Sequence, residues 1–354
     1  MADVNLDAVQ ELKQLDTMGM FNAAWGLPEQ CAQAFTLARA AVLPTDFRPE
    51  QIVVTGLGGS AIGGDLLRVF VGNKIQIPVV VSRDYTLPAF INEKTLVFAV
   101  SYSGNTEETL SAYQEARERK AFIIAVTTGG KLASTASADG APLITIPGGI
   151  SPRSASGYLF IPMLVALERL GLLPDLSAEI EGLVGHLREL REKYRPETPL
   201  DHNPAKQMAL KLQNHIPVIW AASGTTEVVA QRWKGQVNEN AKAPAYWNVF
   251  PELNHNEVVG FEVPELLLQK LWLVFLRNEG DHPRVKARMK ITEGMVKKAG
   301  GITEINSSGP TELARLYSLI YIGDYASMYL AVLYGVDPGP VKVIDYLKGE
   351  LARI

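Results

Sequence analysis

Hydroxyl-bearing side chains and a glycine gather in one short turn of this sequence, at residues 101–106. The turn reads Ser-Tyr-Ser-Gly-Asn-Thr, follows an apolar run at residues 95–100 and precedes a helix-like stretch. Its hydroxyls would stand beside the unpaired backbone N–H groups in the first turn of a helix, an arrangement that holds a phosphate monoester. We therefore interpret this turn as a cradle for the phosphate of a sugar phosphate.

A second candidate is the glycine-rich turn at residues 56–61, which reads Gly-Leu-Gly-Gly-Ser-Ala. It fits the GxGxxA form of the dinucleotide fingerprint, and Arg83 and Asp84 end the next apolar run, where a ribose or its 2′-phosphate would bind. An NAD(P)-dependent dehydrogenase, or plain helix caps and tight turns, are therefore alternatives. The hydroxyls of residues 101–106, however, suit a terminal phosphate, whereas a pyrophosphate is usually held by backbone groups alone. One sugar-phosphate site explains both turns, and its expected contacts are Gly59, Ser60, Ser101, Ser103 and Thr106.

Short apolar runs alternate with helix-like stretches in the first half of the chain. The runs lie at residues 52–55, 77–82, 95–100, 122–127 and 143–146. Strands that are apolar on both faces and alternate with helices indicate a parallel sheet covered on both sides. The two turns would then lie at the carboxyl ends of neighbouring strands, where open α/β sheets bind ligands.

A similar series follows a proline-rich segment at residues 196–204. The strand and turn at residues 217–225 resemble those at residues 52–60, which is a weak internal repeat. We predict an α/β fold of two doubly wound, flavodoxin-like domains with parallel sheets, a helical N-terminal leader and a C-terminal helix. The predicted order is a leader at 1–50, a first domain at 51–175, a helix and linker at 176–204, a second domain at 205–336 and a closing helix at 337–354. Further strands are predicted at 271–276 and near Ile302, and further helices at 226–241 and 311–333.

The composition limits the partners that this chain can have. Its 354 residues include 34 basic and 38 acidic residues, for a net charge of -4, which argues against a surface that binds nucleic-acid phosphates. The first residues carry acids where a secretory signal needs positive charge, and no apolar run reaches the ~20 residues that span a bilayer. The single cysteine, Cys31, excludes an intrachain disulfide and suits a reducing compartment as a buried helix residue. We expect a cytoplasmic protein that binds neither nucleic acid nor a membrane.

The two turns together resemble the sugar isomerase (SIS) domain. Three later motifs resemble the bifunctional phosphoglucose/phosphomannose isomerases: Pro-Arg at 152–153, Asn-Glu-Asn-Ala-Lys at 238–242 and Glu-Leu-Asn-His-Asn-Glu at 252–257. The resemblance covers nearly the whole chain and implies SIS-type domains. It also implies an isomerase that interconverts glucose 6-phosphate and mannose 6-phosphate with fructose 6-phosphate through a cis-enediol, without a cofactor or a metal.

Such a reaction needs a base that moves a proton between C1 and C2, and a cation for the enediolate oxygen. The resemblance gives the first role to Glu239, near the end of a predicted helix, where a solvated surface acid is the alternative. Arg153, in the loop after a predicted strand, would supply the cation, with a salt bridge or a helix-start contact as its alternative role. Asn238 and Asn240 would orient the carboxylate or the sugar hydroxyls, whereas Lys242 is expected to be a surface cation.

Opening of the sugar ring needs a group that both accepts and donates a proton near neutral pH, as an imidazole does. The resemblance implies that His255 opens the ring and reaches the site from the partner subunit of a homodimer, whereas a loop histidine bonded to nearby backbone is the alternative. On the C-terminal helix, Lys348 matches a lysine that the family carries into the site, and Lys342 lies nearly two turns earlier. Gly339 stands where relatives commonly have Thr, so sugar contacts there are expected to differ.

A non-catalytic phosphosugar-binding SIS protein is a further alternative. Regulators of that kind usually carry a basic DNA-binding segment, and the residues before Gln51 are few and not notably basic. A metal site is not expected, because the remaining histidines are scattered without metal-binding spacing: His186, His202, His215 and His282.

Overall fold

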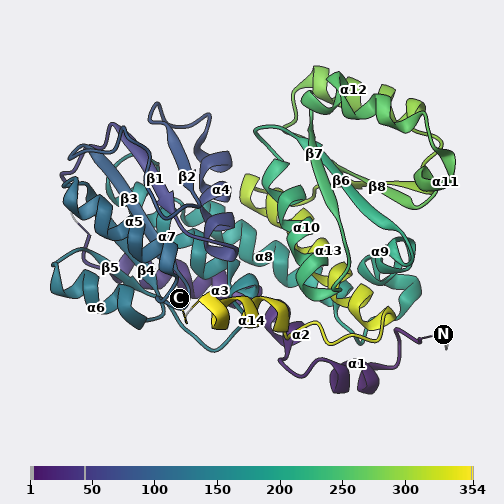
Figure 1. Ribbon diagram of the computed structural model, residues 1–354, viewed down its shortest axis with the longest axis horizontal. Helices are drawn as coiled ribbons and strands as arrows, with labels where there is room; N and C mark the ends of the chain where they lie inside the picture. Colours follow the sequence, from purple (N-terminus) through teal and green to yellow (C-terminus); the bar gives the residue numbers. More distant parts are fainter. Residues whose placement is uncertain (1–3, 44, 352, 354) are drawn as a thin grey trace. The chain divides into compact units, whose positions relative to one another are not determined.

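The computed structural model describes residues 4–43, 45–351 and 353, which form two compact units (Figure 1). The N-sheet unit comprises Gly26–Arg188 and Ser308–Tyr317. The C-sheet unit comprises the described residues up to Trp25, Glu189–Ser307 and the described residues from Ser318 onward. Two of the four chain boundaries between the units fall inside helices, α8 (Ser177–Tyr194) and α13 (Glu312–Leu333).

A five-stranded parallel sheet forms the core of the N-sheet unit, with the strand order β2-β1-β3-β4-β5. The order reverses at β1, which pairs with β2 on one side and β3 on the other. Every residue of β3 is buried, because a central parallel strand is covered on both faces. The predicted doubly wound sheet is therefore confirmed. Its strands are β1 (Gln51–Thr55), β2 (Val79–Ser82), β3 (Thr95–Ser101), β4 (Phe122–Thr127) and β5 (Leu143–Thr145).

Helices cover both faces of this sheet. Val97 and Ala99 of β3 point to the face where α5 and α6 pack and join one core cluster with them. On the opposite face, a Cβ added at Gly64 of α4 would lie 2.8 Å from Val54 Cγ1, so glycine lets α4 approach β1 closely. α7 contacts both α4 and α3. These helices are α3 (Leu27–Ala40), α4 (Gly59–Val71), α5 (Glu107–Glu118), α6 (Gly130–Ala138) and α7 (Ser156–Arg169).

The C-sheet unit repeats this topology with a four-stranded parallel sheet in the order β7-β6-β8-β9. In chain order, β6, β7, β8 and β9 take the places that β1, β2, β3 and β4 have in the other sheet. The predicted second doubly wound sheet is confirmed. Its strands are β6 (Ile216–Ala222), β7 (Tyr246–Phe250), β8 (Leu271–Arg277) and β9 (Gly301–Asn306). The helices of this unit are α1 (Val9–Leu15), α2 (Met20–Trp25), η2 (Leu200–His202), α9 (Pro204–Leu212), α10 (Glu227–Asn240), η3 (Glu252–His255), η4 (Glu257–Phe261), α11 (Glu265–Leu268), α12 (Pro283–Met295) and α14 (Lys342–Leu351).

Of the strands and the helices longer than five residues, three were not predicted from the sequence: β7, α6 and α12. β7 is an edge strand in which Tyr246 and Trp247 are exposed, so it lacks the continuous apolar run of a central strand. α6 is rich in Ser and Thr, which favour helices weakly. α12 buries only Met289 and Thr292, so its sequence shows no apolar stripe.

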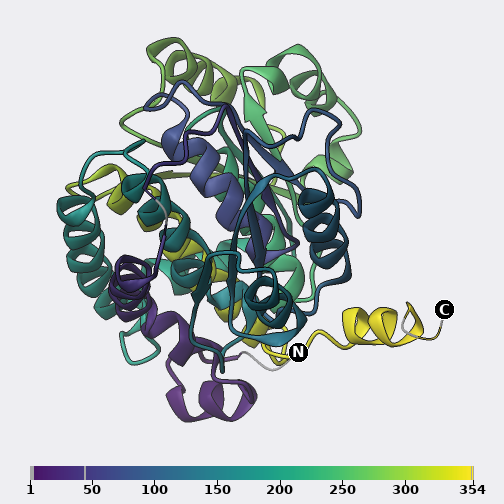
Figure 2. The same ribbon diagram turned by 90° about the vertical axis from the view of Figure 1, so that its left-hand side faces the viewer.

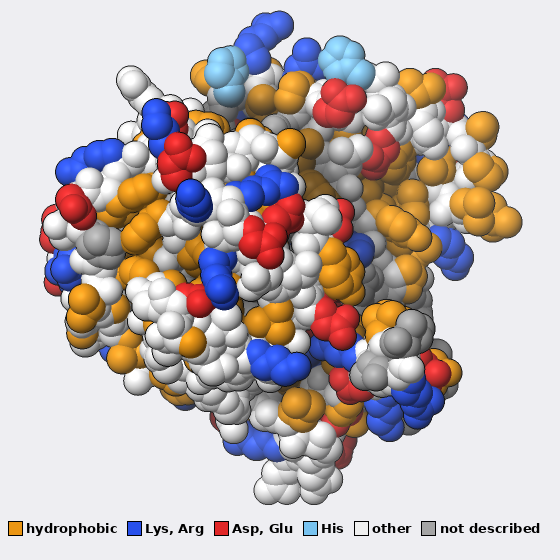
Figure 3. All heavy atoms as spheres, turned by 60° about the vertical axis from the view of Figure 1, so that its left-hand side comes forward, with side chains coloured by type: hydrophobic (Ala, Val, Ile, Leu, Met, Phe, Trp, Pro, Cys, Tyr) orange, Lys and Arg blue, Asp and Glu red, His pale blue; other side chains and the backbone are white. Residues whose placement is uncertain are grey.

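Among the described residues, α13 is the one helix long and apolar enough to cross a membrane, with 22 residues and a mean hydropathy of 1.3. This corrects the expectation that no apolar run reaches spanning length. The apolar window is 100% buried, which is the environment of a core helix in a soluble protein. Acidic and basic side chains are interspersed over the face shown in Figure 3 rather than sorted into areas of one sign.

Cys31 supplies a first test of this packing. It lies on α3 with 0% of its surface exposed, and burial raises the pKa of its thiol far above the usual range. Because the thiolate is the reactive form, we expect the native protein to react with an aromatic disulfide reagent far more slowly than the urea-unfolded protein does. The absorbance of the released thiolate measures both rates. Equal rates would show that Cys31 is not buried by the packing of α3 in the native protein.

Candidate active site

The glycine turn after β1 fits closely against two neighbouring segments. A Cβ added at Gly56 would lie 2.8 Å from Val100 O, at the end of β3. One added at Gly59, where α4 begins, would lie 2.7 Å from Pro152 O. Glycine is therefore needed where β1 approaches β3 and where α4 approaches the short helix η1 (Pro152–Ser154).

The serine-rich turn after β3 is preformed by its own hydrogen bonds. Ser101 Oγ lies 2.8 Å from Thr106 Oγ1 and accepts a 3.1 Å hydrogen bond from Gly104 N–H. Gly104 has a φ of +68°, and a Cβ added there would lie 1.8 Å from Gly129 O. Only glycine fits at this point, and the hydroxyl of the adjacent Ser103 is left at the exposed surface of the turn.

α5 begins at the end of this turn and offers unpaired donors to a ligand. Within the described residues, the backbone N–H groups of residues 107–109 have no acceptor, as expected for a first helical turn. Thr106 is the N-cap, and its side chain makes no capping hydrogen bond. Glu107 and Glu108 also lie in this first turn, so hydroxyl and N–H donors, rather than net positive charge, would hold an anion here.

The two turns lie at the same edge of the sheet. β1 and β3 pair in parallel with Thr55 opposite Ala99, so their carboxyl ends are neighbours. The strand order reverses between these strands, and open α/β sheets bind ligands at such a switch point. The structure therefore brings together the five residues predicted to contact phosphate, which are Gly59, Ser60, Ser101, Ser103 and Thr106.

Arg153 lies beside the first of these turns. A Cβ added at Gly59 would lie 3.4 Å from Arg153 Cα. The Arg153 side chain is 6% exposed, and its Nη1 donates a 2.8 Å hydrogen bond to Ser151 Oγ. The predicted cation is therefore held by its surroundings next to the phosphate turns.

Tyr102 belongs to this site but was missed by sequence reasoning. Its carbonyl accepts hydrogen bonds from Thr128 N–H, at 3.1 Å, and from Thr128 Oγ1, at 2.7 Å. Its hydroxyl accepts a 3.2 Å hydrogen bond from Ile150 N–H, three residues before Arg153. Burial raises the pKa of Tyr102, so its hydroxyl stays protonated. Tyr102 thus ties the serine turn to the Arg153 loop, a role that its place between two serines does not reveal.

Glu239 lies in the last turn of α10 and is half-buried. The amides on either side of it are used inside the protein. Asn238 Nδ2 donates to Ala243 O at 2.8 Å, and Asn240 Nδ2 donates to Ser327 Oγ at 2.9 Å. These bonds hold the end of α10 in place.

Lys242 follows α10 and helps to end it. Its φ is +54°, and its Nζ donates to Asn240 O at 3.1 Å and to Asp337 O at 2.5 Å. A cation here complements the negative end of the helix dipole. Lys242 is exposed, as predicted, but it also links α10 to the segment before α14.

His255 ends the short helix η3, which the buried Leu253 anchors in the core. Its side chain is exposed, and no group in the described part of the chain is hydrogen-bonded to its imidazole. The ring is therefore available to a ligand or to another chain.

α14 has no buried residue and stands clear of the rest of its unit (Figure 2). Lys348 and Lys342 are both exposed. Among the described residues, neither lysine forms a hydrogen bond or an ion pair with Glu239. Before the helix, a Cβ added at Gly339 would lie 2.6 Å from Met18 Cβ. A Thr would not fit there unless the N-terminal segment moved.

Arg83, a residue that a dinucleotide phosphate would need, is engaged within the N-sheet unit. Its Nη2 forms an ion pair with Asp65, which is 4% exposed on α4. This pairing weakens the interpretation of the glycine turn as a dinucleotide site.

The chain matches known sugar isomerases along most of its length. The SIS domain family matches residues 47–170, and the bacterial phospho-glucose isomerase C-terminal SIS domain matches residues 201–351. A bifunctional phosphoglucose/phosphomannose isomerase of Caldicellulosiruptor bescii is 53% identical over 337 residues, which cover 95% of this chain and 99% of that one. Another, of Aquifex aeolicus, is 38% identical over 85% of this chain and 90% of its own length. The chain belongs to this isomerase family.

A solved structure shares the fold of this family member. A glucose-6-phosphate isomerase-like protein from Thermus thermophilus matches with a TM-score of 0.65 and 19% identity, over 96% of this chain and 99% of that one. At this identity the match supports the fold alone. It agrees with the two parallel sheets described above.

In the C-sheet unit, the turn after β6 corresponds to the glycine turn after β1, but its hydrogen-bond donors are already occupied. After β6, Ser223 Oγ and Gly224 N–H donate to Glu227 Oε2 at 3.0 and 3.1 Å. Thr225 Oγ1 donates to Asp281, in the turn after β8. Two carboxylates thus take the donors that an anion would use, so the repeated topology does not repeat the cradle.

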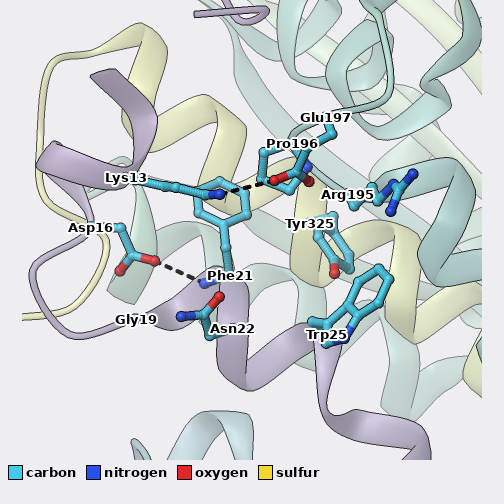
Figure 4. Close-up of a pocket in the computed structure, with 10 residues that line it drawn as sticks. All are labelled: Lys13, Asp16, Gly19, Phe21, Asn22, Trp25, Arg195, Pro196, Glu197 and Tyr325. Atoms are coloured by element: carbon cyan, nitrogen blue, oxygen red, sulfur yellow. Dashed lines mark hydrogen bonds and ion pairs between the residues drawn. The ribbon is translucent and has the colours of Figure 1, made fainter. Parts of the chain in front are cut away.

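A cavity of about 380 Å³ lies elsewhere in the C-sheet unit, among α1, α2 and α13 (Figure 4). Lys13 Nζ pairs with Glu197 Oε1 at 3.0 Å, and Asp16 accepts hydrogen bonds from two backbone N–H groups at the start of α2. Tyr325, on α13, also lines the cavity. None of the predicted site residues lines the cavity, so we assign it to the packing of the N-terminal helices.

Gly104→Ala tests whether the serine turn depends on close packing. The added Cβ would collide with Gly129 O and must adopt a positive φ, so we expect a loss of ~1–3 kcal/mol in the free energy of unfolding and weaker binding of a phosphate monoester. Gly185→Ala on α8 is the control, because no atom lies within 4 Å of its added Cβ. Urea unfolding and isothermal titration measure the two effects. Equal behaviour of both variants would contradict the close packing.

Proposed function

We propose that this protein is an aldose-ketose isomerase that interconverts glucose 6-phosphate and mannose 6-phosphate with fructose 6-phosphate. The observation that carries the proposal is the pair of turns at the edge of β1 and β3, whose hydroxyl and N–H donors suit a phosphate monoester. Membership of the isomerase family supplies the reaction. The proposed setting is the cytoplasm, and the proposed chemistry uses side chains alone.

In this reaction Glu239 acts as the base. Its carboxylate takes the proton from C2 of the open-chain aldose while the C1 carbonyl oxygen becomes the enediolate oxygen. Arg153 stabilises the charge that develops there, because a guanidinium stays protonated. Return of the proton to C1 and transfer of the C2 hydroxyl proton to the C1 oxygen give the ketose. Rotation about C2–C3 lets one base serve both epimers.

His255 is assigned to ring opening. It accepts the proton of the C1 hydroxyl and donates one to the ring oxygen, so the cyclic sugar becomes the open aldehyde. Lys348, on the exposed helix α14, is assigned as a cation that contacts the substrate from the C-terminal helix. The phosphate, at the other end of the sugar, is bound by Gly59, Ser60, Ser101, Ser103 and Thr106.

We infer further that the protein works as a homodimer in which His255 serves the site of the partner subunit. Exposed apolar side chains follow His255 directly along the chain, on η4 and α11, and continue on α12, which contacts η4. Large exposed apolar side chains of this kind favour an interface with another chain. They are Val259, Val263, Leu266, Leu267, Ile291 and Met295, which are 62%, 75%, 74%, 61%, 65% and 60% exposed.

Glu239→Gln tests the proposed base. The amide keeps the size of the side chain but cannot take a proton, so we expect kcat to fall by ~10²–10⁴-fold for both 6-phosphates. Coupled assays measure the rates, and binding of 5-phosphoarabinonate, an enediolate mimic, should persist. Glu279→Gln, at an exposed acid of the same unit, is the control and should keep full activity. Full turnover by Glu239→Gln would exclude the mechanism and favour a different base or a non-catalytic sugar-binding protein.

A mixture of two inactive variants tests the shared site. Glu239→Gln and His255→Ala are each expected to be inactive, but a mixed dimer would hold one site with both residues intact. Random exchange of subunits in a symmetric dimer should restore about a quarter of the wild-type activity. Each variant alone, taken through the same unfolding and refolding, is the control. An inactive mixture that is dimeric by light scattering would place His255 in the site of its own subunit.

A further inference from the structure

A buried ion pair joins α10, the helix that carries Glu239, to α13. Arg232 Nε donates to Asp324 Oδ1 at 3.0 Å, and Arg232 Nη2 donates to Asp324 Oδ2 at 2.7 Å. The two residues are 4% and 7% exposed. Gln236 Nε2, one turn further along α10, donates to the same Oδ1 at 2.8 Å. Both oxygens of this carboxylate are thus occupied by donors from one helix.

The pair lies on the side of α10 that leads to Glu239. With 3.6 residues per turn, positions 232, 236 and 239 follow one another along one side of the helix. Gln236, which binds Asp324, is therefore one turn before Glu239. Beyond it, Asn240 Nδ2 donates to Ser327 Oγ at 2.9 Å, and Ser327 Oγ donates to Asp324 O at 2.7 Å. Glu239 therefore lies between two residues of α10, Gln236 and Asn240, that are each hydrogen-bonded to α13.

The side chain of Trp233, on α10, also packs against the backbone of α13 near the pair. A Cβ added at Gly323 would lie 2.1 Å from Trp233 Nε1, and Trp233 Nε1 donates to Leu319 O at 2.8 Å. A planar guanidinium that binds both carboxylate oxygens also restricts the orientation of the two helices relative to each other. Sliding or rolling of α10 on α13 would therefore break several hydrogen bonds at once.

Stability alone does not explain an ion pair at this depth. Taking two charges out of water costs about as much as their attraction returns, and apolar pairs of similar size often replace them without loss of stability. An apolar pair, however, makes no hydrogen bonds and so does not fix the relative orientation of its two helices. The ion pair adds a two-point directional contact to the other hydrogen bonds that orient α10.

We propose that Arg232 and Asp324, with Gln236, form a positioning device that sets the register and roll of α10 so that the Glu239 carboxylate meets the sugar carbon in line for proton transfer. The proposal rests on the assignment of Glu239 as the base. A base displaced by about 1 Å loses on the order of 100-fold in rate. None of the residues proposed to hold the phosphate takes part in these hydrogen bonds, so substrate affinity should depend little on this device.

The test compares Arg232→Met/Asp324→Leu with the wild type. We expect the double variant to unfold at a similar urea concentration and to keep its KM, while kcat falls by roughly 10- to 100-fold for both 6-phosphates. Arg232→Lys keeps the charge but loses the two-point contact, and we expect it to lower kcat as well. Lys206→Met is the control in the same unit. It removes the ion pair between the buried Lys206 and the partly exposed Asp7, at 2.8 Å, and should keep kcat per folded molecule.

Unchanged kcat in a folded double variant would overturn the proposal. Should that variant not fold, Gln236→Met carries the test, since it leaves the ion pair intact and removes one hydrogen bond. A fall in kcat at unchanged KM then supports the positioning role, and an unchanged kcat overturns it. Glu239→Gln separates this outcome from a failure of the proposed function. If Glu239→Gln is fully active, Glu239 is not the base; if only Glu239→Gln is impaired, the base is correct and the positioning role is wrong.

Discussion

Parallel pairing of β1 with β3 determines where the two turns of the proposed phosphate site lie. It brings the ends of two strands to one edge of the sheet, and each strand leads at once into the first turn of a helix. The ends of β1 and β3 can approach closely because Gly56 stands against Val100 O. The turn after β3 packs in the same way against the turn after β4, because Gly104 stands against Gly129 O. A side chain at either position would push a turn out of place. The hydroxyl and N–H donors are useful because the backbone beneath them packs closely.

The same packing links the phosphate turns to the cation. Gly59 lets α4 approach η1, and Tyr102 reaches from the serine turn to the backbone before Arg153. A guanidinium on a mobile loop would have to be ordered by each substrate that binds, at a cost in entropy. Here the N-sheet unit holds it before any ligand arrives, with Ser151 as a hydrogen-bond acceptor.

The C-sheet unit repeats the strand order but not the chemistry. Its corresponding turn is filled by the carboxylates of Glu227 and Asp281, which take the donors that bind an anion elsewhere. A phosphate would meet like charge there and find its donors occupied. The unit instead presents a carboxylate, Glu239, on a helix that buried polar contacts hold to α13. The two sheets thus share one topology but differ in the residues of their turns.

Local patterns in the sequence were enough to predict the two parallel sheets, most of their strands, the two turns after β1 and β3, and α10. Apolar runs, turn residues and helix ends depend on neighbours a few residues away, so they can be read along the chain. β7, α6 and α12 were missed because an exposed edge strand and weakly amphipathic helices lack such patterns. The chain's membership of an isomerase family also followed from short motifs.

Only the tertiary structure decided which distant residues meet. Arg153 stands beside Gly59, and Tyr102 binds the backbone of Ile150. Arg232 meets Asp324, 92 residues away, in the interior. Arg232 and Asp324 are ordinary charged residues in the sequence, where most such residues are solvated. Their role depends on burial and on the direction of a bond, and both arise only when separate helices pack against each other.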